Sequence, residues 1–212
     1  VFIYCIAIYL LNRWKTTGKS NQSTFIWGIA FAVYGVVFVA VMFQALGYSW
    51  ANMNLPLYFF IFRQAMIIWV ALMYYGMASI ILQSKIAKLL PTILIIVFSY
   101  VWFYVGLFIM ADVEYTMYIF LFCIWTPICF VIAYMFYLYG QAYDILSTKI
   151  CAGGFILLGI TYLAWAPWHF GPVVYIYFIW FSVFNISLVV IFIGFLLLPY
   201  EIEKKVKKAD LS

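Results

Sequence analysis

Long apolar runs with almost no charge are the feature that most restricts how this chain can fold. Of its 212 residues, 70% are hydrophobic and 8% are charged, whereas a soluble domain averages about 45–50% apolar and about 25% charged residues. A helix crosses the hydrocarbon core of a bilayer with about 20 mostly apolar residues. The composition therefore excludes a water-soluble globule, a disordered chain and a nucleic-acid-binding module, and makes the lipid bilayer the first expected partner.

Seven apolar runs are candidates for membrane-spanning helices. Their approximate bounds are Val1–Leu11, Thr24–Leu46, Leu55–Leu82, Pro91–Met110, Thr116–Tyr139, Ile150–Trp168 and Val173–Leu198. They lack the alternation of barrel strands, which are only about 9–11 residues long. We therefore expect an all-α integral membrane protein, with a seven-helix bundle over residues 1–199 and a basic cytoplasmic tail over 200–212. Because the first run is too short to span the core, we expect its outer part to be missing from the sequence.

Basic residues are concentrated at one end of the predicted helices. Ten of the eleven lie in alternate loops and in the tail: Arg13, Lys15, Lys19, Lys85, Lys88, Lys149, Lys204, Lys205, Lys207 and Lys208. The loops at the other end, 47–54, 111–114 and 169–172, contain no Lys or Arg. Because loops rich in Lys and Arg stay in the cytoplasm, this asymmetry predicts an N-terminus outside and a C-terminus inside. With no organelle signal in the sequence, we expect a prokaryotic plasma membrane.

Prolines and glycines give local expectations. Pro56 and Pro91 are predicted to start helices, where a missing N–H is tolerated, and Pro199 is predicted to end one. Pro127 lies inside a run and should kink it. Small residues that allow close helix approach, or alternatively a hinge, lie in the second and sixth runs. They are Gly28, Ala32, Gly35, Gly153, Gly154 and Gly159.

Arg63 is the one charged residue inside a predicted span. An intramembrane ionisable residue indicates function by default, so one hypothesis is an outward-facing polar pocket that binds a ligand. The residues of this pocket would be Arg63, Gln64, Asn185 and Ser182. In the alternative, Arg63 reaches the outer interface and pairs with Asp112 or Glu114.

The predicted spans lack the groups that most membrane chemistry needs. They contain no Asp or Glu, which argues against proton coupling. The single histidine cannot supply two axial haem ligands, and the four cysteines have neither CxxC nor metal-ligand spacing. No pair of nucleophile and base is present. We therefore expect no enzyme, no cofactor and no metal site.

The order and orientation of the helices resemble those of the microbial rhodopsins. The positions that carry the resemblance are Leu46-Gly47-Tyr48, Arg63, Pro167, Phe184–Val189 and the segment that begins at Phe195. Asn185 stands where that family has its counter-ion Asp, and Val189 stands where it has the lysine that binds retinal. Since every lysine of this chain lies in a loop or the tail, a Schiff base has no amine to form on. The resemblance thus implies an opsin-like bundle without retinal.

Two other seven-helix groups share this topology. Trp165 and Asn185 are similar to the midplane substrate contacts of sugar facilitators, which implies a carrier. The tail, in which Glu201 and Glu203 each precede a lysine by four residues, is similar to that of sensor regions joined to signalling domains. The last helix could then continue into the cytoplasm as a signalling rod, or the tail could be a basic anchor for anionic headgroups.

These observations leave two functions open. The first is a non-catalytic sensor- or receptor-like protein, or a subunit of a membrane complex, whose further partners would be other membrane subunits or a cytoplasmic signalling protein. The second is a facilitative carrier of a small neutral solute, without proton coupling.

Overall fold

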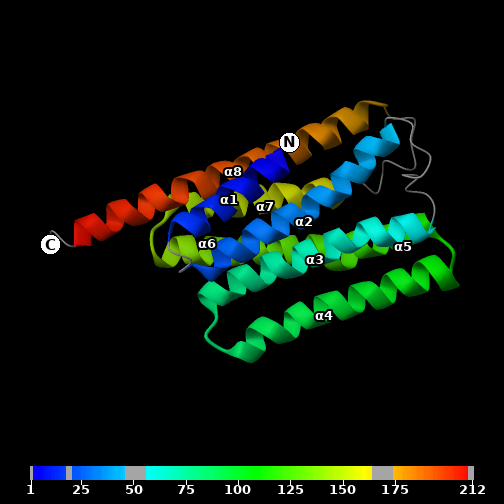
Figure 1. The fold of residues 1–212 in the computed structure, drawn as a ribbon, viewed down its shortest axis with the longest axis horizontal. Coiled ribbons are helices and arrows are strands. Elements are labelled where there is room, and N and C mark those ends of the chain that lie inside the picture. The colour runs from blue at the N-terminus through cyan, green and yellow to red at the C-terminus, as the bar shows by residue number, and fades with distance from the viewer. Residues whose placement is uncertain (1, 18–20, 46–55, 164–173, 210–212) are drawn as a thin grey trace. The chain divides into compact units, whose positions relative to one another are not determined.

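The computed structural model describes residues 2–17, 21–45, 56–163 and 174–209, and every regular element in these ranges is a helix (Figure 1). Six of the helical runs are long and apolar enough to cross a membrane. Their bounds are Gln22–Val39, Arg63–Ile81, Lys85–Ile109, Tyr115–Ala142, Leu146–Leu163 and Phe181–Lys204. The predicted all-α class is confirmed, and the six apolar helices indicate an integral membrane protein.

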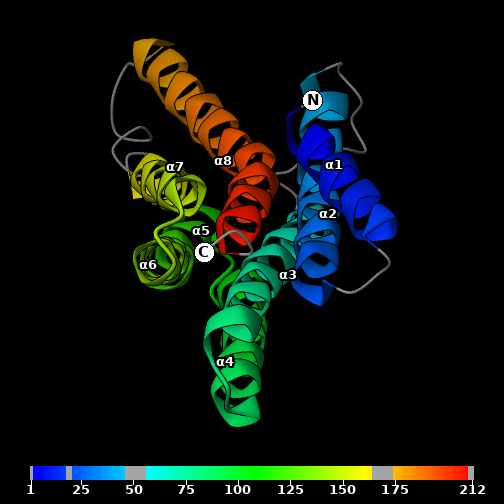
Figure 2. The ribbon, with the colours of Figure 1, turned by 90° about the vertical axis from the view of Figure 1, so that its left-hand side faces the viewer.

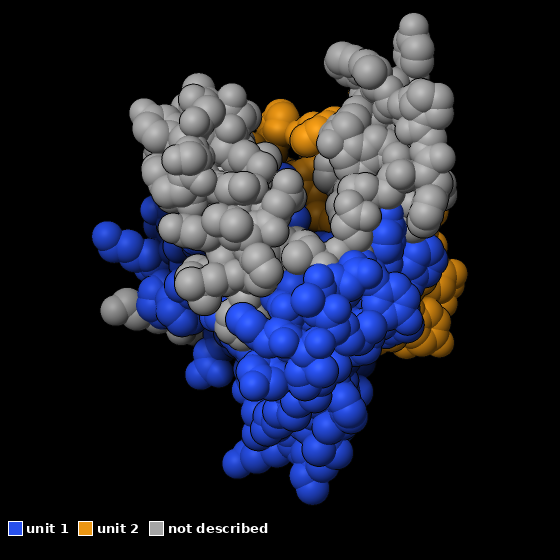
Figure 3. Space-filling view, turned by 90° about the vertical axis from the view of Figure 1, so that its right-hand side faces the viewer, with its two compact units in different colours: residues 1, 3–125 blue, residues 2, 126–212 orange. Residues whose placement is uncertain are grey.

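The chain divides into two compact units, shown in different colours in Figure 3. Residues 3–125 make up almost all of unit 1, and residues 126–212 almost all of unit 2. The helices of unit 1 are α1 (Phe2–Thr16), α2 (Gln22–Ala45), α3 (Pro56–Ile81), α4 (Lys85–Tyr104) and α5 (Val113–Phe120), with π-helical segments η2 (Val105–Ile109) and η3 (Leu121–Trp125). Those of unit 2 are α6 (Thr126–Ala142), α7 (Leu146–Leu163) and α8 (Val174–Ala209).

In unit 1, α1 lies along α2 and runs antiparallel to it (Figures 1 and 2). A Cβ added at Gly28 would lie 2.8 Å from Leu11 Cγ, and one at Gly35 would collide with the Tyr4 ring. Both glycines are therefore places where the two helices approach more closely than a side chain would allow. The predicted close approach along this face of α2 is confirmed at Gly28 and Gly35.

The α4–α5 hairpin of unit 1 is closed by a chain of local contacts. Gly106 lies against Thr116 with no room for a Cβ, and Trp102 donates its Nε1–H to the Thr116 carbonyl at 2.8 Å. Ala111 takes a left-handed conformation with φ 54°, and the Asp112 carboxylate caps α5 by accepting the Tyr115 N–H at 2.9 Å. These contacts reverse the chain within the three residues 110–112. The turn lies at the end of the helices where the sequence has no Lys or Arg.

Unit 2 is an antiparallel set in which α7 packs on both α6 and α8 (Figure 2). At the end of α6, the N–H groups of Ile145 and Asp144 donate to the carbonyls of Gly140 and Gln141, at 2.9 and 3.4 Å. Asp144 has φ 49°, so this is a Schellman motif with a left-handed residue other than glycine. Asp tolerates that conformation better than most residues.

Glycines also bring the helices of unit 2 together. A Cβ at Gly154 of α7 would lie 2.6 Å from Ile191 Cγ1 and 2.9 Å from the Ile191 backbone nitrogen, and one at Gly159 would lie 2.8 Å from the Phe130 ring. Around Gly153 there is open space within 4 Å. The small residues of this run thus divide into Gly154 and Gly159, which pack tightly as predicted, and Gly153, which does not.

Several predicted helix limits are wrong. Helix α4 begins at Lys85, where the Ser84 side chain caps the Ala87 N–H, so Pro91 lies inside the helix rather than at its start. Helix α8 continues through Pro199 to Ala209. Pro56 does begin α3. Pro127 is the second residue of α6 and lies two residues after the end of the π segment 121–125, which is a local departure from α geometry of the kind that a helix proline requires.

Basic residues predicted in loops lie in helices instead. Arg13 and Lys15 belong to the last turn of α1, which continues to Thr16, and Lys85 and Lys88 belong to the first turns of α4. The helices extend beyond the apolar runs because a helix end in the headgroup layer can still satisfy its polar groups with water or a cap. Hydropathy marks the lipid-facing length and therefore underestimates the helix.

Candidate functional site

The four residues predicted to form a polar pocket are divided between the two units. Arg63 and Gln64 are half-buried on α3 in unit 1. Arg63 Nη1 lies 3.3 Å from Met66 Sδ, one turn along the same helix. Gln64 Oε1 accepts a hydrogen bond from the Tyr100 hydroxyl on α4 at 3.4 Å. Gln64 therefore takes part in holding α3 to α4.

Ser182 and Asn185 are exposed on α8 in unit 2. The Asn185 Nδ2 donates to the Phe181 carbonyl of its own helix at 2.7 Å, so the amide is partly used within the helix. The convergence of these residues with Arg63 and Gln64 stays a prediction. For the alternative pairing of Arg63, Asp112 serves as the cap of α5, and the side chain of Glu114 lies outside the described residues.

Some residues of the predicted resemblances lie outside the described part of the chain. These are Leu46, Gly47, Tyr48, Trp165 and Pro167. Val189 is half-buried on α8 and Phe195 is buried on the same helix.

The centre of unit 1 is an aromatic stack that the sequence interpretation missed. Tyr34 of α2 stacks on Trp69 of α3 with ring centroids 4.8 Å apart, and Trp69 stacks on Trp125 of η3 at 4.7 Å with only 19° between the planes. All three side chains are 0% exposed. The Phe31 ring meets Trp69 edge-on, with ring centroids 5.9 Å apart. The Phe120 ring is tilted against Trp125, with centroids 6.3 Å apart. The stack thus joins three separate helical segments.

The sequence held one signal for this stack. Trp125 lies two residues before Pro127, and a proline inside a helix disturbs the turn that precedes it. That turn is the π segment 121–125, and such segments occur often at functional positions. With 50 Phe, Tyr and Trp residues in the chain, however, nothing in the pattern distinguishes buried rings from lipid-facing ones.

A second polar contact holds α8 to α7 within unit 2. Glu201 Oε2 accepts hydrogen bonds from both the backbone N–H and the hydroxyl of Ser147, each at 2.8 Å. Ser147 is the second residue of α7, so its N–H has no acceptor inside its own helix. A carboxylate at this position also interacts favourably with the helix dipole. We refer to this arrangement as the Glu201–Ser147 contact.

Along the described ranges, no three His, Cys, Asp or Glu side chains gather as they would to hold a metal ion. Cys129 and Cys151 are buried, whereas Cys5 and Cys123 are exposed. No protein family, curated protein or solved structure was found to match this chain. The six long apolar helices define the class as the all-helical membrane proteins, and any function must be argued from the contacts above.

Proposed function

We propose that this chain is a seven-helix membrane protein without catalysis of its own, with its N-terminus outside and its C-terminus in the cytoplasm, and that it serves as a sensor- or receptor-like protein. Helix α1, antiparallel to α2 through Leu11 with Gly28 and Tyr4 with Gly35, would be the seventh helix of the bundle.

The positions of the lysines support this orientation. Lys85, Lys88 and Lys149 lie in the first turns of α4 and α7, where the helix dipole disfavours a positive charge. Local helix energetics therefore do not explain why lysines are there. The retention of Lys and Arg on the cytoplasmic side of a membrane explains these positions.

The observation that carries the receptor-like function is the length and attachment of α8. Its 36 residues extend about 54 Å, whereas about 20 residues cross the hydrocarbon core. The part of α8 that exceeds the thickness of the core includes the turns after Pro199. The Glu201–Ser147 contact fixes these turns to the start of α7. A displacement of the membrane-spanning part of α8 would thus be transmitted to a helical segment beyond the hydrocarbon core.

Hydrogen exchange of the full chain in lipid nanodiscs tests this coupling. We expect Arg63→Ala, in the span of α3, to change the exchange rate of amides 200–209, because a receptor-like bundle transmits changes between its two ends. Lys85→Ala removes a charge from an exposed helix start and is the control. Unchanged exchange of 200–209 in Arg63→Ala would contradict the receptor-like function.

Thiol labelling of intact cells tests the orientation. In a chain with Cys5 and Cys123 replaced by Ser, Met110→Cys should react with an impermeant reagent from outside, because Met110 is 46% exposed at the end without Lys or Arg. Lys204→Cys should react only after permeabilisation. The reverse pattern would overturn the proposed orientation without affecting the exchange experiment.

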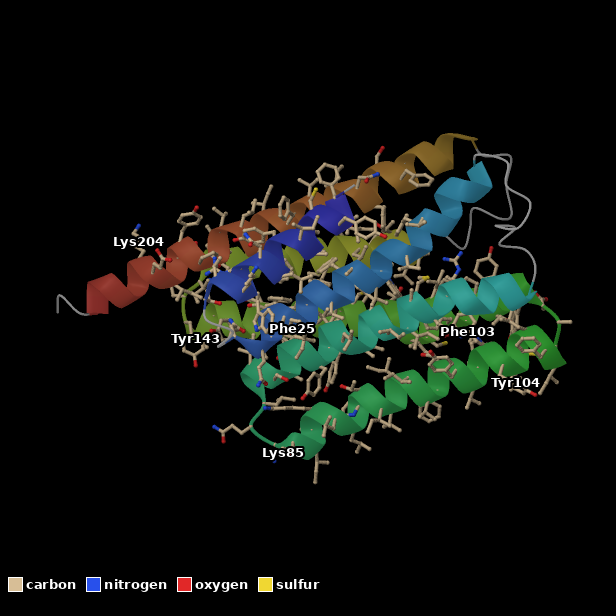
Figure 4. All side chains as sticks on the ribbon, in the orientation of Figure 1. Phe25, Lys85, Phe103, Tyr104, Tyr143 and Lys204 are labelled. Atoms are coloured by element: carbon tan, nitrogen blue, oxygen red, sulfur yellow. The ribbon has the colours of Figure 1, made fainter. Side chains whose placement is uncertain are left out.

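For a role as a subunit of a membrane complex, the candidate surface is the exposed side of α4. Five side chains of the α4–η2 run are at least half exposed: Ile86, Ile93, Phe98, Tyr104 and Ile109. Two adjacent residues, labelled in Figure 4, mark the two sides of the helix, since Phe103 is 1% and Tyr104 58% exposed. A stoichiometric membrane partner after purification in mild detergent would support the subunit role. Uptake of a neutral solute by vesicles, abolished by Asn185→Ala, would instead support a carrier.

A further inference from the structure

The end of α8 combines a dense positive charge with amphipathic and apolar side chains. Four of the five positions from 204 to 208 are lysines, and no acidic residue lies among them. Lys204 is exposed and projects away from α8 (Figure 4). In the turn before it, Tyr200 is 72% and Ile202 is 41% exposed. Tyr is enriched at the boundary between hydrocarbon and headgroups, so this turn has the chemistry of an interfacial segment.

We propose that residues 200–209 lie at the headgroup layer of the bilayer and bind anionic phospholipids through Lys204, Lys205, Lys207 and Lys208. At 1.5 Å per residue, these lysines are about 8–14 Å beyond Pro199 along the helix. The headgroup layer adds roughly 5–8 Å on each side of the hydrocarbon core. Lysine side chains can reach back several ångströms along a helix, and therefore reach the phosphates.

The Glu201–Ser147 contact makes this binding more favourable in two ways. It holds one carboxylate oxygen of Glu201, Oε2, against two donors of α7, and so directs this carboxylate toward Ser147. It also attaches the segment to a second helix, so less conformational freedom is lost when lipid binds. Each lysine near an anionic surface contributes about 1 kcal/mol, which corresponds to about a fivefold change in binding.

A phospholipid fits this segment better than an acidic protein does. Tyr200 and Ile202 are exposed in the turn that follows the apolar part of α8, where a bilayer covers such side chains and an aqueous partner would leave them next to water. The proposal rests on the proposed membrane insertion of α8. It does not need the inward C-terminus, because the test below uses bilayers with the same lipids in both leaflets.

The experiment compares the full chain in nanodiscs of phosphatidylcholine alone and of phosphatidylcholine mixed with phosphatidylglycerol. Hydrogen exchange of amides 200–209 reports the segment, and mass spectrometry counts the phosphatidylglycerol retained after mild detergent extraction. One variant replaces the four tail lysines by Gln. The matched control replaces Lys15, Lys19, Lys85 and Lys88 by Gln and removes the same charge elsewhere.

We expect phosphatidylglycerol to slow exchange of 200–209 in the wild type and in the control, by about fivefold or more, and to have no effect in the tail variant. Added salt should reverse the slowing in the wild type, because exposed charges are screened, and this measurement remains valid if the tail variant fails to fold. Equal exchange in both lipid mixtures would overturn the proposal. Slowing by added polyglutamate, but not by phosphatidylglycerol, would overturn it in favour of an acidic protein partner.

Discussion

The Tyr74 hydroxyl of α3 donates a hydrogen bond to the Ala87 carbonyl of α4, 3.2 Å away. In an unbroken α-helix that carbonyl would accept the N–H of residue 91, which is a proline and has none. The hydroxyl of a neighbouring helix therefore replaces the bond that Pro91 removes. This relationship explains how α4 tolerates an internal proline, because a protein donor satisfies the carbonyl that Pro91 leaves without its usual partner.

Replacing Tyr74 with Phe should destabilise the α3–α4 pair. The substitution keeps the ring and removes the hydroxyl, so the Ala87 carbonyl loses a donor that its own helix cannot supply. We expect a loss of about 1 kcal/mol in the free energy of unfolding, between the average of about 0.6 kcal/mol for hydrogen bonds between membrane helices and the cost of a buried unsatisfied carbonyl. Reversible unfolding in mixed micelles measures it.

The matched control restores the missing N–H by Pro91→Ala. In that background the backbone N–H of the substituted residue can donate to the Ala87 carbonyl, so Tyr74→Phe should cost much less. A double-mutant cycle gives the difference directly. Equal costs in the two backgrounds would show that Tyr74 acts through its ring alone.

Adjacent glycines of α7 provide a second test. Gly154→Ala puts a methyl group 2.9 Å from the backbone nitrogen of Ile191, which cannot move without moving α8, so we expect a loss of about 1–3 kcal/mol. Gly153→Ala meets nothing within 4 Å and should stabilise the helix by about 0.5–1 kcal/mol. Thermal unfolding of the two variants in the same detergent should therefore shift in opposite directions, and a shared direction would contradict the packing at Gly154.

The aromatic stack can be detected by its spectrum. Because the Trp69 and Trp125 rings are stacked with centroids 4.7 Å apart, their electronic transitions are coupled and should give a paired signal in near-ultraviolet circular dichroism. Trp69→Phe and Trp125→Phe should each abolish that whole signal. Trp14→Phe should leave it intact, because Trp14 contacts Phe25 instead. If each substitution instead removed only its own part of the signal, and the two losses added up to the whole, the two rings would not be coupled.

The class of fold could be predicted from the sequence because the bilayer requires long apolar helices and little else. Gly28, Gly35 and Gly154 were recognisable as packing residues for the same reason, since small side chains are the main means of close helix approach in lipid. The limits of α4 and α8 could not be predicted. Pro91 and Pro199 are local signals to start or stop a helix, and at Pro91 a contact with Tyr74, 13 residues before Ala87, overrides the signal.

The candidate sites were less predictable than the fold. A single charge such as Arg63 is visible in an apolar sequence, but whether it meets Asn185 depends on tertiary arrangement. Trp69 and Trp125 are 56 residues apart in sequence, and no spacing rule pairs them. The sequence indicates only Lys205 as a partner of Glu201, because i,i+4 pairs on one helix are the contacts that a sequence displays. The structure instead joins Glu201 to Ser147 of α7.

Glu201→Gln tests the Glu201–Ser147 contact against its neighbour Glu203. Both substitutions remove one negative charge from α8, but Glu203 is exposed and Glu201 binds the first turn of α7. A neutral amide oxygen forms hydrogen bonds about half as strong as a carboxylate's and gains less from the helix dipole. We expect a loss of about 1 kcal/mol in local stability, which appears as about fivefold faster exchange of amides at Ser147 and after Pro199.

Glu203→Gln should leave these exchange rates unchanged. Ser147→Ala, which keeps the backbone donor, should give an intermediate effect. If Glu203→Gln accelerates exchange as much as Glu201→Gln, the charge of the segment and not this contact fixes the end of α8.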